Sequence, residues 1–149
     1  MAFEIDTQIL DLLEVVVDDL LTVFDVNSPP VPVEIMLQRP KTGMWQQVNL
    51  GEMSTTFLRV SEQYGLRLSI ARLLARHICR SVWGEAHGLT AYSKNDTVIY
   101  ALARALLIPR RLIVDQKAPH DSIAVSYRFG VPESAARLRL MELNLALST

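Results

Sequence analysis

Three arginines recur at every fourth position of one predicted helix, at Arg72, Arg76 and Arg80. This spacing places side chains on the same face of an α-helix, so the three guanidinium groups form a basic stripe, the arginine stripe. A guanidinium fork can bind an anion or the carboxylate of a partner protein. It can also pair with Asp96 or another carboxylate of its own chain, or form a solvated helix surface. The sequence alone leaves these alternatives open.

Two further groups on the same helix could take part in chemistry. His77 follows Arg76 and is turned from it by about 100°, toward the apolar face. We therefore interpret His77 as a hydrogen-bonded core or boundary residue rather than a ligand. Cys79 is the only cysteine and does not share a face with His77. A buried, unreactive thiol is the better interpretation of Cys79 than a nucleophile.

The other two histidines lie in predicted connections. Glu85 and His87 fall in a loop bounded by glycines and could pair, although exposed loop residues are the simpler interpretation. His120 follows a proline and is typical of a turn residue. No Ser/His/Asp or Cys/His arrangement has supporting context, so we predict neither a metal nor a cofactor.

Residues 122–143 have the pattern of a helix-turn-helix, with Gly130 at the turn. The second helix carries Arg137 and Arg139, which are possible DNA contacts. The alternative is that this pair packs within the domain. Together with Ser134 these side chains are too few for sequence readout, so we favour packing.

Hydrophobic periodicity predicts the helices that must position these residues. The predicted helices span residues 7–25, 67–82, 96–108, 122–129 and 133–143. Residues 33–38 are interpreted as a short helix or strand, 83–95 as a loop, and part of 44–60 as a small β element. Candidate N-caps precede two of the helices, Asp6 or Thr7 for the first and Asn95 or Asp96 for the third.

A length of 149 residues predicts one domain, 1–149. Its expected parts are an N-terminal helix with a proline-rich link (7–40), a small β or irregular region (41–66), the helices around the arginine stripe (67–109) and the C-terminal helix pair (120–145). The expected fold class is α+β, mainly α.

The net charge of −1 conceals an uneven distribution. Residues 1–66 hold 3 Lys/Arg and 10 Asp/Glu, a charge of −7, whereas residues 67–139 hold 12 Lys/Arg and 5 Asp/Glu, a charge of +7. A basic half is compatible with an anion or nucleic-acid footprint. The simpler interpretation is that the two halves complement each other across the fold.

The chain has no basic segment followed by an apolar run at its start, and no apolar run of the ~20 residues that span a bilayer. A single cysteine excludes a disulfide within the chain and a Cys-rich zinc site. We expect a cytoplasmic protein with no membrane association.

Three segments resemble a known family. Residues 67–77 read RLSIARLLARH, residues 99–109 read IYALARALLIP, and residues 124–140 read AVSYRFGVPESAARLRL. In order and spacing they resemble the segments R-x-x-[IL]-A-H-E-L-x-H, A-x-x-F-A-x-x-L-L-M-P and A-x-x-F-x-V-S-x-x-A-x-x-x-R-L of ImmA/IrrE-type metallopeptidase domains. The resemblance covers about residues 7–143, with 41–63 poorly matched. It implies a zincin-like helical domain with a small β element.

The resemblance also shows what this chain lacks. In such a motif two histidines four residues apart share one zinc, a glutamate polarises the bound water, and a later helix supplies a third ligand. Here these positions hold Arg72, Leu73 and Arg76, and the later ligand falls near Val98, with Asp96 the nearest carboxylate. A guanidinium stays protonated and cannot ligate zinc. The resemblance therefore implies the fold and argues against the peptidase activity.

We accordingly expect a catalytically inactive metallopeptidase-like domain that acts as a protein-interaction or regulatory module. The resembled family suggests a DNA-binding repressor of mobile elements or stress responses, or a larger complex, as its context. The first alternative is a DNA-binding protein that uses the C-terminal helix pair and the basic second half. The second is a metal-dependent peptidase with a non-standard site.

Overall fold

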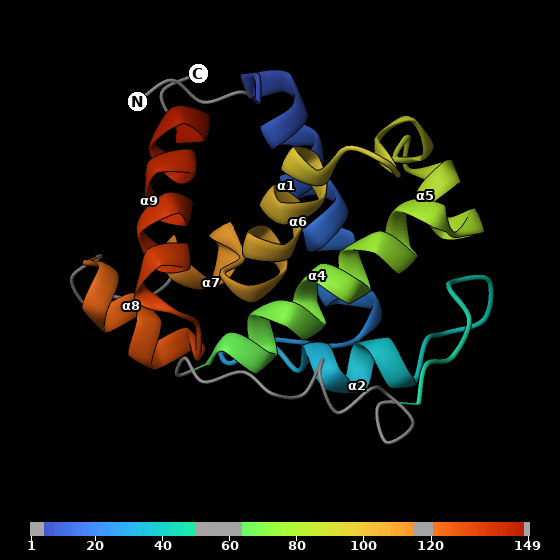
Figure 1. Ribbon diagram of the computed structural model, residues 1–149, viewed down its shortest axis with the longest axis horizontal. Helices are drawn as coiled ribbons and strands as arrows, with labels where there is room; N and C mark the ends of the chain where they lie inside the picture. The colour runs from blue at the N-terminus through green and yellow to red at the C-terminus, as the bar shows by residue number, and fades with distance from the viewer. Residues whose placement is uncertain (1–4, 50–63, 115–120, 148–149) are drawn as a thin grey trace.

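Helices form the whole of the regular structure in the residues that the computed structural model describes, which are 5–49, 64–114 and 121–147 (Figure 1). They are α1 (Thr7–Val23), α2 (Val33–Gln38), α4 (Gly65–Arg80), α5 (Val82–Ala86), the 3-10 helix η2 (Thr90–Tyr92), α6 (Asp96–Leu107), α7 (Arg110–Val114), α8 (Ser122–Phe129) and α9 (Glu133–Leu147). The expectation of a mainly α fold is confirmed. None of the helices in these ranges is long and apolar enough to cross a membrane.

Helix α6 lies at the centre of the packing, since α1, α4 and α9 all contact it. Its sequence explains this place, because apolar residues occur around most of its circumference. Its buried residues are Val98, Ile99, Ala101, Leu102, Ala103, Ala105, Leu106 and Leu107. Helix α4 crosses α6 diagonally and also packs on α2 (Figure 1). This contact brings the arginine stripe beside the exposed edge of α6.

Carboxylate or amide side chains cap the first turn of α1, α6 and α8. Asp6, Asn95 and Asp121 each accept a hydrogen bond from the backbone N–H three residues later, at 3.0, 3.2 and 2.7 Å. Each carboxylate or amide oxygen satisfies one of the N–H groups that the first turn leaves unpaired. The predicted starts of α1, α6 and α8 are confirmed. Gly130 ends α8 in a left-handed conformation with φ of 68°, as helix C-termini favour.

The prediction of a loop at residues 83–95 is wrong, because this segment contains most of α5 and all of η2. The Ser81 hydroxyl accepts a hydrogen bond from Gly84 N at 2.9 Å and starts α5. The turn that follows brings Gly84 so close to α4 that a Cβ there would lie 1.9 Å from the Ile78 carbonyl oxygen. Helices of five and three residues are too short for a periodic pattern, which explains the error.

The expected small β element is not seen where the chain is described. Residues 44–49 form no strand, and 50–60 lie outside the described residues. Residues 33–38, which the sequence left open between helix and strand, form α2. Trp45 fixes the following segment against α2, because its indole Nε1 donates a hydrogen bond to Met36 O at 3.2 Å.

Two buried ion pairs tie α9 to the rest of the fold. The Arg139 guanidinium contacts both carboxylate oxygens of Glu14 on α1, at 2.7 and 2.8 Å, and its Nε donates to Ile108 O at 2.9 Å. Arg104 on α6 makes a similar two-point contact with Glu142 at 3.0 and 2.6 Å. Paired geometry of this kind satisfies the guanidinium and the carboxylate together, as burial requires.

Arg67 connects three segments that are distant in the sequence. At the start of α4 it pairs with Glu34 of α2 at 2.6 Å and donates to the backbone oxygens of Val31 and Gly130 at 2.9 and 3.0 Å. The carbonyl groups of the proline-rich link and of the α8–α9 turn are thereby satisfied by one side chain. This contact fixes the position of the first turn of α4.

Candidate functional site

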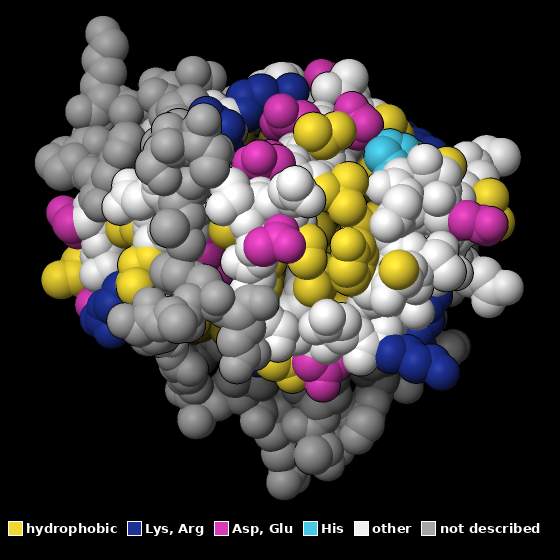
Figure 2. All heavy atoms as spheres, turned by 90° about the horizontal axis from the view of Figure 1, so that it is seen from above, with side chains coloured by type: hydrophobic (Ala, Val, Ile, Leu, Met, Phe, Trp, Pro, Cys, Tyr) yellow, Lys and Arg dark blue, Asp and Glu magenta, His cyan; other side chains and the backbone are white. Residues whose placement is uncertain are grey.

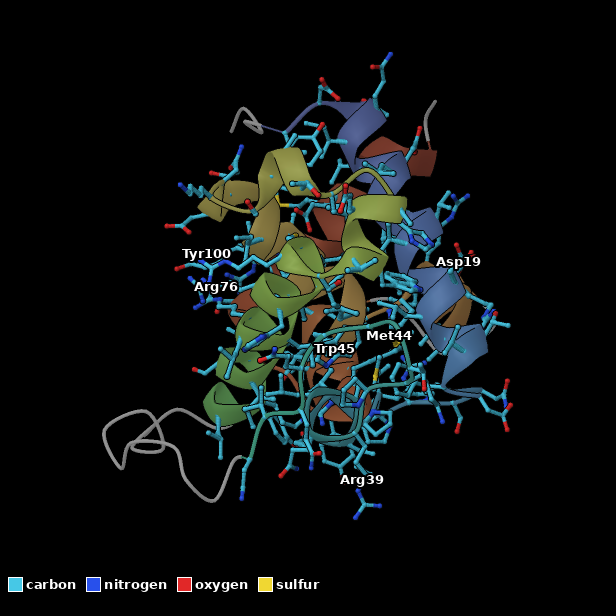
Figure 3. The ribbon with its side chains drawn as sticks, turned by 90° about the vertical axis from the view of Figure 1, so that its right-hand side faces the viewer. Asp19, Arg39, Met44, Trp45, Arg76 and Tyr100 are labelled. Carbon is cyan, nitrogen blue, oxygen red and sulfur yellow. The ribbon has the colours of Figure 1, made fainter. Side chains whose placement is uncertain are left out.

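The arginine stripe meets an aromatic ring of α6. The Arg72 guanidinium lies over the ring of Tyr100, 4.2 Å from its centroid, and the Arg76 guanidinium lies 5.8 Å from the same centroid. Figure 3 shows Arg76 and Tyr100 side by side at the edge of the molecule. Both distances are within the range of cation–π attraction. Tyr100 therefore joins the two arginines into one cluster, the Arg–Tyr cluster.

Asp96 lies one turn before Tyr100 and completes this surface. Its Oδ1 is 3.9 Å from Arg76 Nη2, and the two side chains are 72% and 34% exposed. Because a solvated ion pair at this distance contributes little, the Arg76 guanidinium keeps most of its capacity to bind another acceptor. The predicted pairing of Arg76 with Asp96 is thus present, but in a weak form.

Arg80 does not belong to the Arg–Tyr cluster. Each step of four residues turns a helix by about 40°, so Arg80 is turned by about 80° from Arg72. It is exposed and lines a different hollow, together with His77 and Met44. The three arginines that the spacing placed on one face therefore divide between two surfaces.

The donor atoms of the cluster do not fit zinc. Arg72 and Arg76 carry no lone pair for a metal, and Leu73 between them has no polar atom. Across the described ranges, His, Cys, Asp and Glu nowhere gather in a group of three or more that could hold a metal ion. The arrangement suits recognition of a carboxylate or another anion, for which an exposed guanidinium supplies charge and directed donors.

Cys79 lies where it was predicted, and His77 lies at the predicted boundary of the core but without the expected hydrogen bond to another described residue. His77 is half-buried on α4, and burial together with the nearby Arg80 charge lowers its pKa. Cys79 is fully buried, and burial raises the pKa of its thiol to about 11. Cys79 is therefore a protonated thiol at neutral pH, as the interpretation of a buried, unreactive residue requires.

His87 is not an exposed loop residue, and its partner is not Glu85. Its Nε2 lies 3.0 Å from Asp19 Oδ2 on α1, and its Nδ1 lies 2.8 Å from the Trp83 carbonyl oxygen. The imidazole also stacks on the Trp83 ring, with centroids 3.7 Å apart. The partner lies 68 positions earlier in the chain, so no local pattern could indicate it. His120 lies outside the described residues.

The interpretation of Arg139 as a DNA contact is wrong. Its side chain is 1% exposed and its donors are occupied by Glu14 and Ile108. Arg137 is exposed, but it pairs with Glu133 one turn earlier at 2.8 Å. Helix α9 therefore presents its two arginines to different environments, and only Arg137 is on the surface.

The uneven charge of the sequence is partly resolved inside the fold. Arg67 with Glu34, Arg139 with Glu14 and His87 with Asp19 each join the basic second half to the acidic first half. These pairs agree with the expectation that the halves complement each other. Seen from above, acidic side chains lie around an apolar strip and basic side chains lie toward the edges (Figure 2). This face is therefore not a basic patch.

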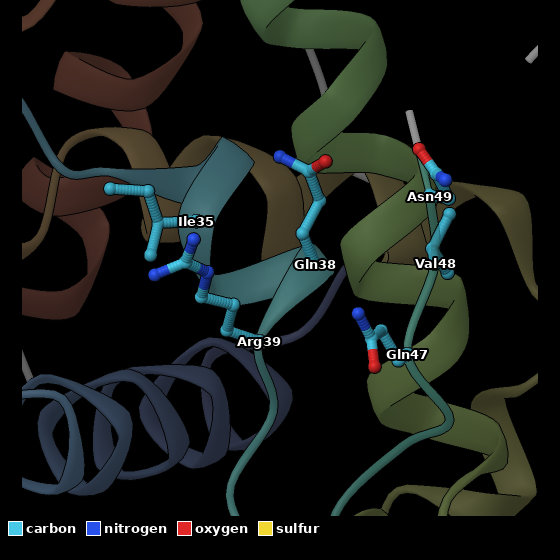
Figure 4. Close-up of a pocket in the computed structure, with 6 residues that line it drawn as sticks. All are labelled: Ile35, Gln38, Arg39, Gln47, Val48 and Asn49. Carbon is cyan, nitrogen blue, oxygen red and sulfur yellow. The ribbon is translucent and has the colours of Figure 1, made fainter. Parts of the chain in front are cut away.

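A second hollow lies between α2 and the segment that follows it. Its volume is about 350 Å³, and Figure 4 shows the residues that line it. They are Ile35, Gln38, Arg39, Gln47, Val48 and Asn49. Gln38 Nε2 donates to Glu34 O at 3.2 Å, and Arg39 and Gln47 are exposed. The Gln38 amide is thus engaged by its own helix and the exposed Arg39 and Gln47 are solvated, which gives no ligand a clear preference for this hollow.

Tyr100 is the residue that sequence reasoning missed. A tyrosine on an apolar helix is usually a core residue, and nothing local marks it as the partner of two arginines 24 and 28 positions earlier. Its place one turn after Asp96 was the available signal, because the two share a face of α6.

Scans against family models and searches of curated proteins and of solved structures found no match to this chain.

Proposed function

We propose that this protein is a non-catalytic, metallopeptidase-like module that binds a partner protein through the surface between α4 and α6. The observation that carries the proposal is the Arg–Tyr cluster. Arg72 and Arg76 occupy the positions that hold the zinc-binding histidines in the family that the sequence resembles, and both lie beside Tyr100. Cationic side chains packed on an aromatic ring supply binding groups and no metal ligands.

Arg76 is the group best placed to meet a partner. It is one-third exposed, its contact with Asp96 is long, and the Tyr100 ring limits the positions that its guanidinium can take. Less conformational entropy is lost when a restrained side chain binds. A carboxylate of the partner would gain a charged hydrogen bond while displacing only a weak, solvated pair.

The resemblance suggests the kind of partner. Domains of the resembled family act on, or together with, DNA-binding repressors, so a repressor or a complex that contains one is the expected context. Recognition through Arg76 requires an acidic side chain on the partner. The DNA-binding alternative depends now on Arg137 alone among the residues first considered for it, because Arg139 is enclosed in the fold.

Affinity capture from the native cell at low expression tests the proposal. The wild-type chain is compared with R76Q, which removes the more exposed charge that the proposal assigns to partner binding, and with R137Q, a matched control at another exposed, ion-paired arginine. We expect a protein partner that is captured by wild type and R137Q and reduced at least fivefold with R76Q. Equal capture by all three chains would contradict the role of the cluster. Retention of DNA that R137Q abolishes would favour the alternative.

A further inference from the structure

A hollow separate from the Arg–Tyr cluster opens where the C-terminal end of α4 meets residues 44–46. Its volume is about 400 Å³, within the range of small-molecule sites. Met44, Trp45 and Val82 form its apolar wall, and Figure 3 labels Met44 and Trp45 on the segment that runs beside α4. Arg80 contributes a permanent positive charge, and His77 contributes an imidazole that can gain or lose a proton.

Two of the other polar residues of this hollow are already engaged, and the third, Gln46, contributes an exposed, uncharged amide. The Ser81 hydroxyl donates to Ile78 O at 2.7 Å and accepts from Gly84 N. The Trp45 indole N–H is used by Met36 O, so the indole can present only apolar surface to a ligand. Recognition of a charged group in this hollow therefore falls to Arg80, with His77 and the Gln46 amide as the uncharged polar groups beside it.

Arg80 differs from the paired arginines of the fold. Arg67, Arg104 and Arg139 each contact a carboxylate within 2.7 Å. Across the described part of the chain Arg80 makes no ion pair, and the hollow has no Asp or Glu among its described lining residues. One unneutralised guanidinium at the rim of an apolar hollow favours a single negative charge on the ligand.

His77 supplies an uncharged polar group beside that guanidinium. It is half-buried, and no hydrogen bond joins its ring to another described residue. Burial and the Arg80 charge lower its pKa, so the imidazole is neutral at neutral pH. A neutral imidazole has one N–H donor and one acceptor nitrogen. It can therefore donate to a carboxylate without adding a second positive charge.

From these contacts we propose that the hollow binds a small organic carboxylate with an apolar or aromatic body. The carboxylate pairs with the Arg80 fork and accepts a hydrogen bond from His77. The apolar body lies against Met44, Trp45 and Val82. Such a group exists in a free organic acid and in the C-terminal residue of a peptide, and both present the same chemistry to this site. The site does not depend on the function proposed for the Arg–Tyr cluster.

Calorimetric titration of the full chain tests this site with four probes. Benzoate represents the free acid and N-acetylphenylalanine represents a chain terminus. Acetate lacks the apolar body, and benzyl alcohol lacks the charge. We expect saturable, one-to-one binding of at least one of the first two, and binding of acetate and benzyl alcohol that is at least about tenfold weaker. The tighter of the first two probes identifies the source of the carboxylate.

Two substitutions locate the binding. R80Q should weaken it at least about tenfold, because a charged hydrogen-bonded pair is lost. R39Q, at an exposed arginine of the neighbouring hollow, should leave it within twofold. Circular dichroism of each variant confirms that the helices are intact. Absence of saturable binding by both carboxylates, or equal binding by wild type and R80Q, would overturn the assignment.

Discussion

Arginines in the interior of the fold and arginines on the surface of α4 have different roles, although both present a guanidinium group. Arg139 and Arg104 are enclosed, and each makes a two-point contact with one glutamate. Arg76 is one-third exposed and makes one long ion pair, whereas Arg80 is exposed and makes no ion pair with the described residues. The two enclosed ion pairs hold α9 in place. The guanidinium groups of Arg76 and Arg80 on α4 can still bind another acceptor. Substitutions should therefore separate stability from binding.

The largest loss of stability should follow R139M. The substitution leaves Glu14 buried with no cation, and breaking such a pair from one side costs about 3–5 kcal/mol. The measurement is urea unfolding followed by circular dichroism. The double variant E14L/R139M should recover most of the loss, because no buried charge is left without a partner. A loss below about 1 kcal/mol for R139M would show that the pair does not hold α9.

A smaller effect is expected at the ring that the α4 arginines share. Y100L removes the aromatic face under Arg72 and Arg76 and should lower the free energy of unfolding by about 1 kcal/mol. Y100F keeps the ring and is the matched control, with an expected change below about 0.5 kcal/mol. Equal unfolding curves for Y100L and wild type would show that the cation–π contacts do not stabilise the fold.

His77 makes stability depend on pH in a defined direction. Its pKa in the folded state is lowered below the ordinary value of 6.5 by burial and by Arg80. The unfolded chain therefore binds more protons as pH falls through 6.5, and folding stability declines until the pH passes below the folded pKa. H77Q should lose this part of the decline between pH 7.5 and 5. Parallel pH profiles of wild type and H77Q would contradict the lowered pKa.

The smallest effects on stability belong to R76Q and R80Q. Exposed arginines with weak or absent ion pairs contribute less than about 0.5 kcal/mol. Thermal or urea unfolding should therefore barely distinguish either variant from wild type, although each is expected to lose a binding partner or ligand. A loss of more than about 1 kcal/mol would mean that the residue is part of the structural frame.

Long amphipathic segments of the fold could be predicted from the sequence, and tertiary contacts could not. The starts of α1, α6, α8 and α9 follow from apolar periodicity, supported by the predicted caps Asp6 and Asn95, whereas α1 and α6 end two residues and one residue earlier than predicted and the cap Asp121 was not predicted. The elements α5, η2 and α7 are too short to show a periodic apolar pattern, so periodicity could not predict them. The pairing of Arg139 with Glu14 joins residues 125 positions apart, and side-chain type alone does not separate a buried arginine from a DNA contact.

The candidate site was predicted in composition but not in geometry. Helical spacing grouped Arg72 with Arg76, the family resemblance suggested Asp96 as their neighbour, and the structure places Arg76 within 3.9 Å of Asp96. Helical turn accumulates over eight residues, so Arg80 reaches another surface. The role of Tyr100 needed the crossing of α4 over α6, which depends on how the two helices pack and is not encoded in either segment alone.

The zinc content of the purified chain tests the central claim most directly. The full chain is incubated with excess Zn²⁺ at neutral pH, desalted, and measured by elemental mass spectrometry beside a zinc protein of known stoichiometry. Because Arg72 and Arg76 stand where the proposed resemblance would place the zinc-binding histidines, the account predicts far less than one zinc per chain and no chelator-sensitive peptidase activity. About one retained zinc per chain would contradict it.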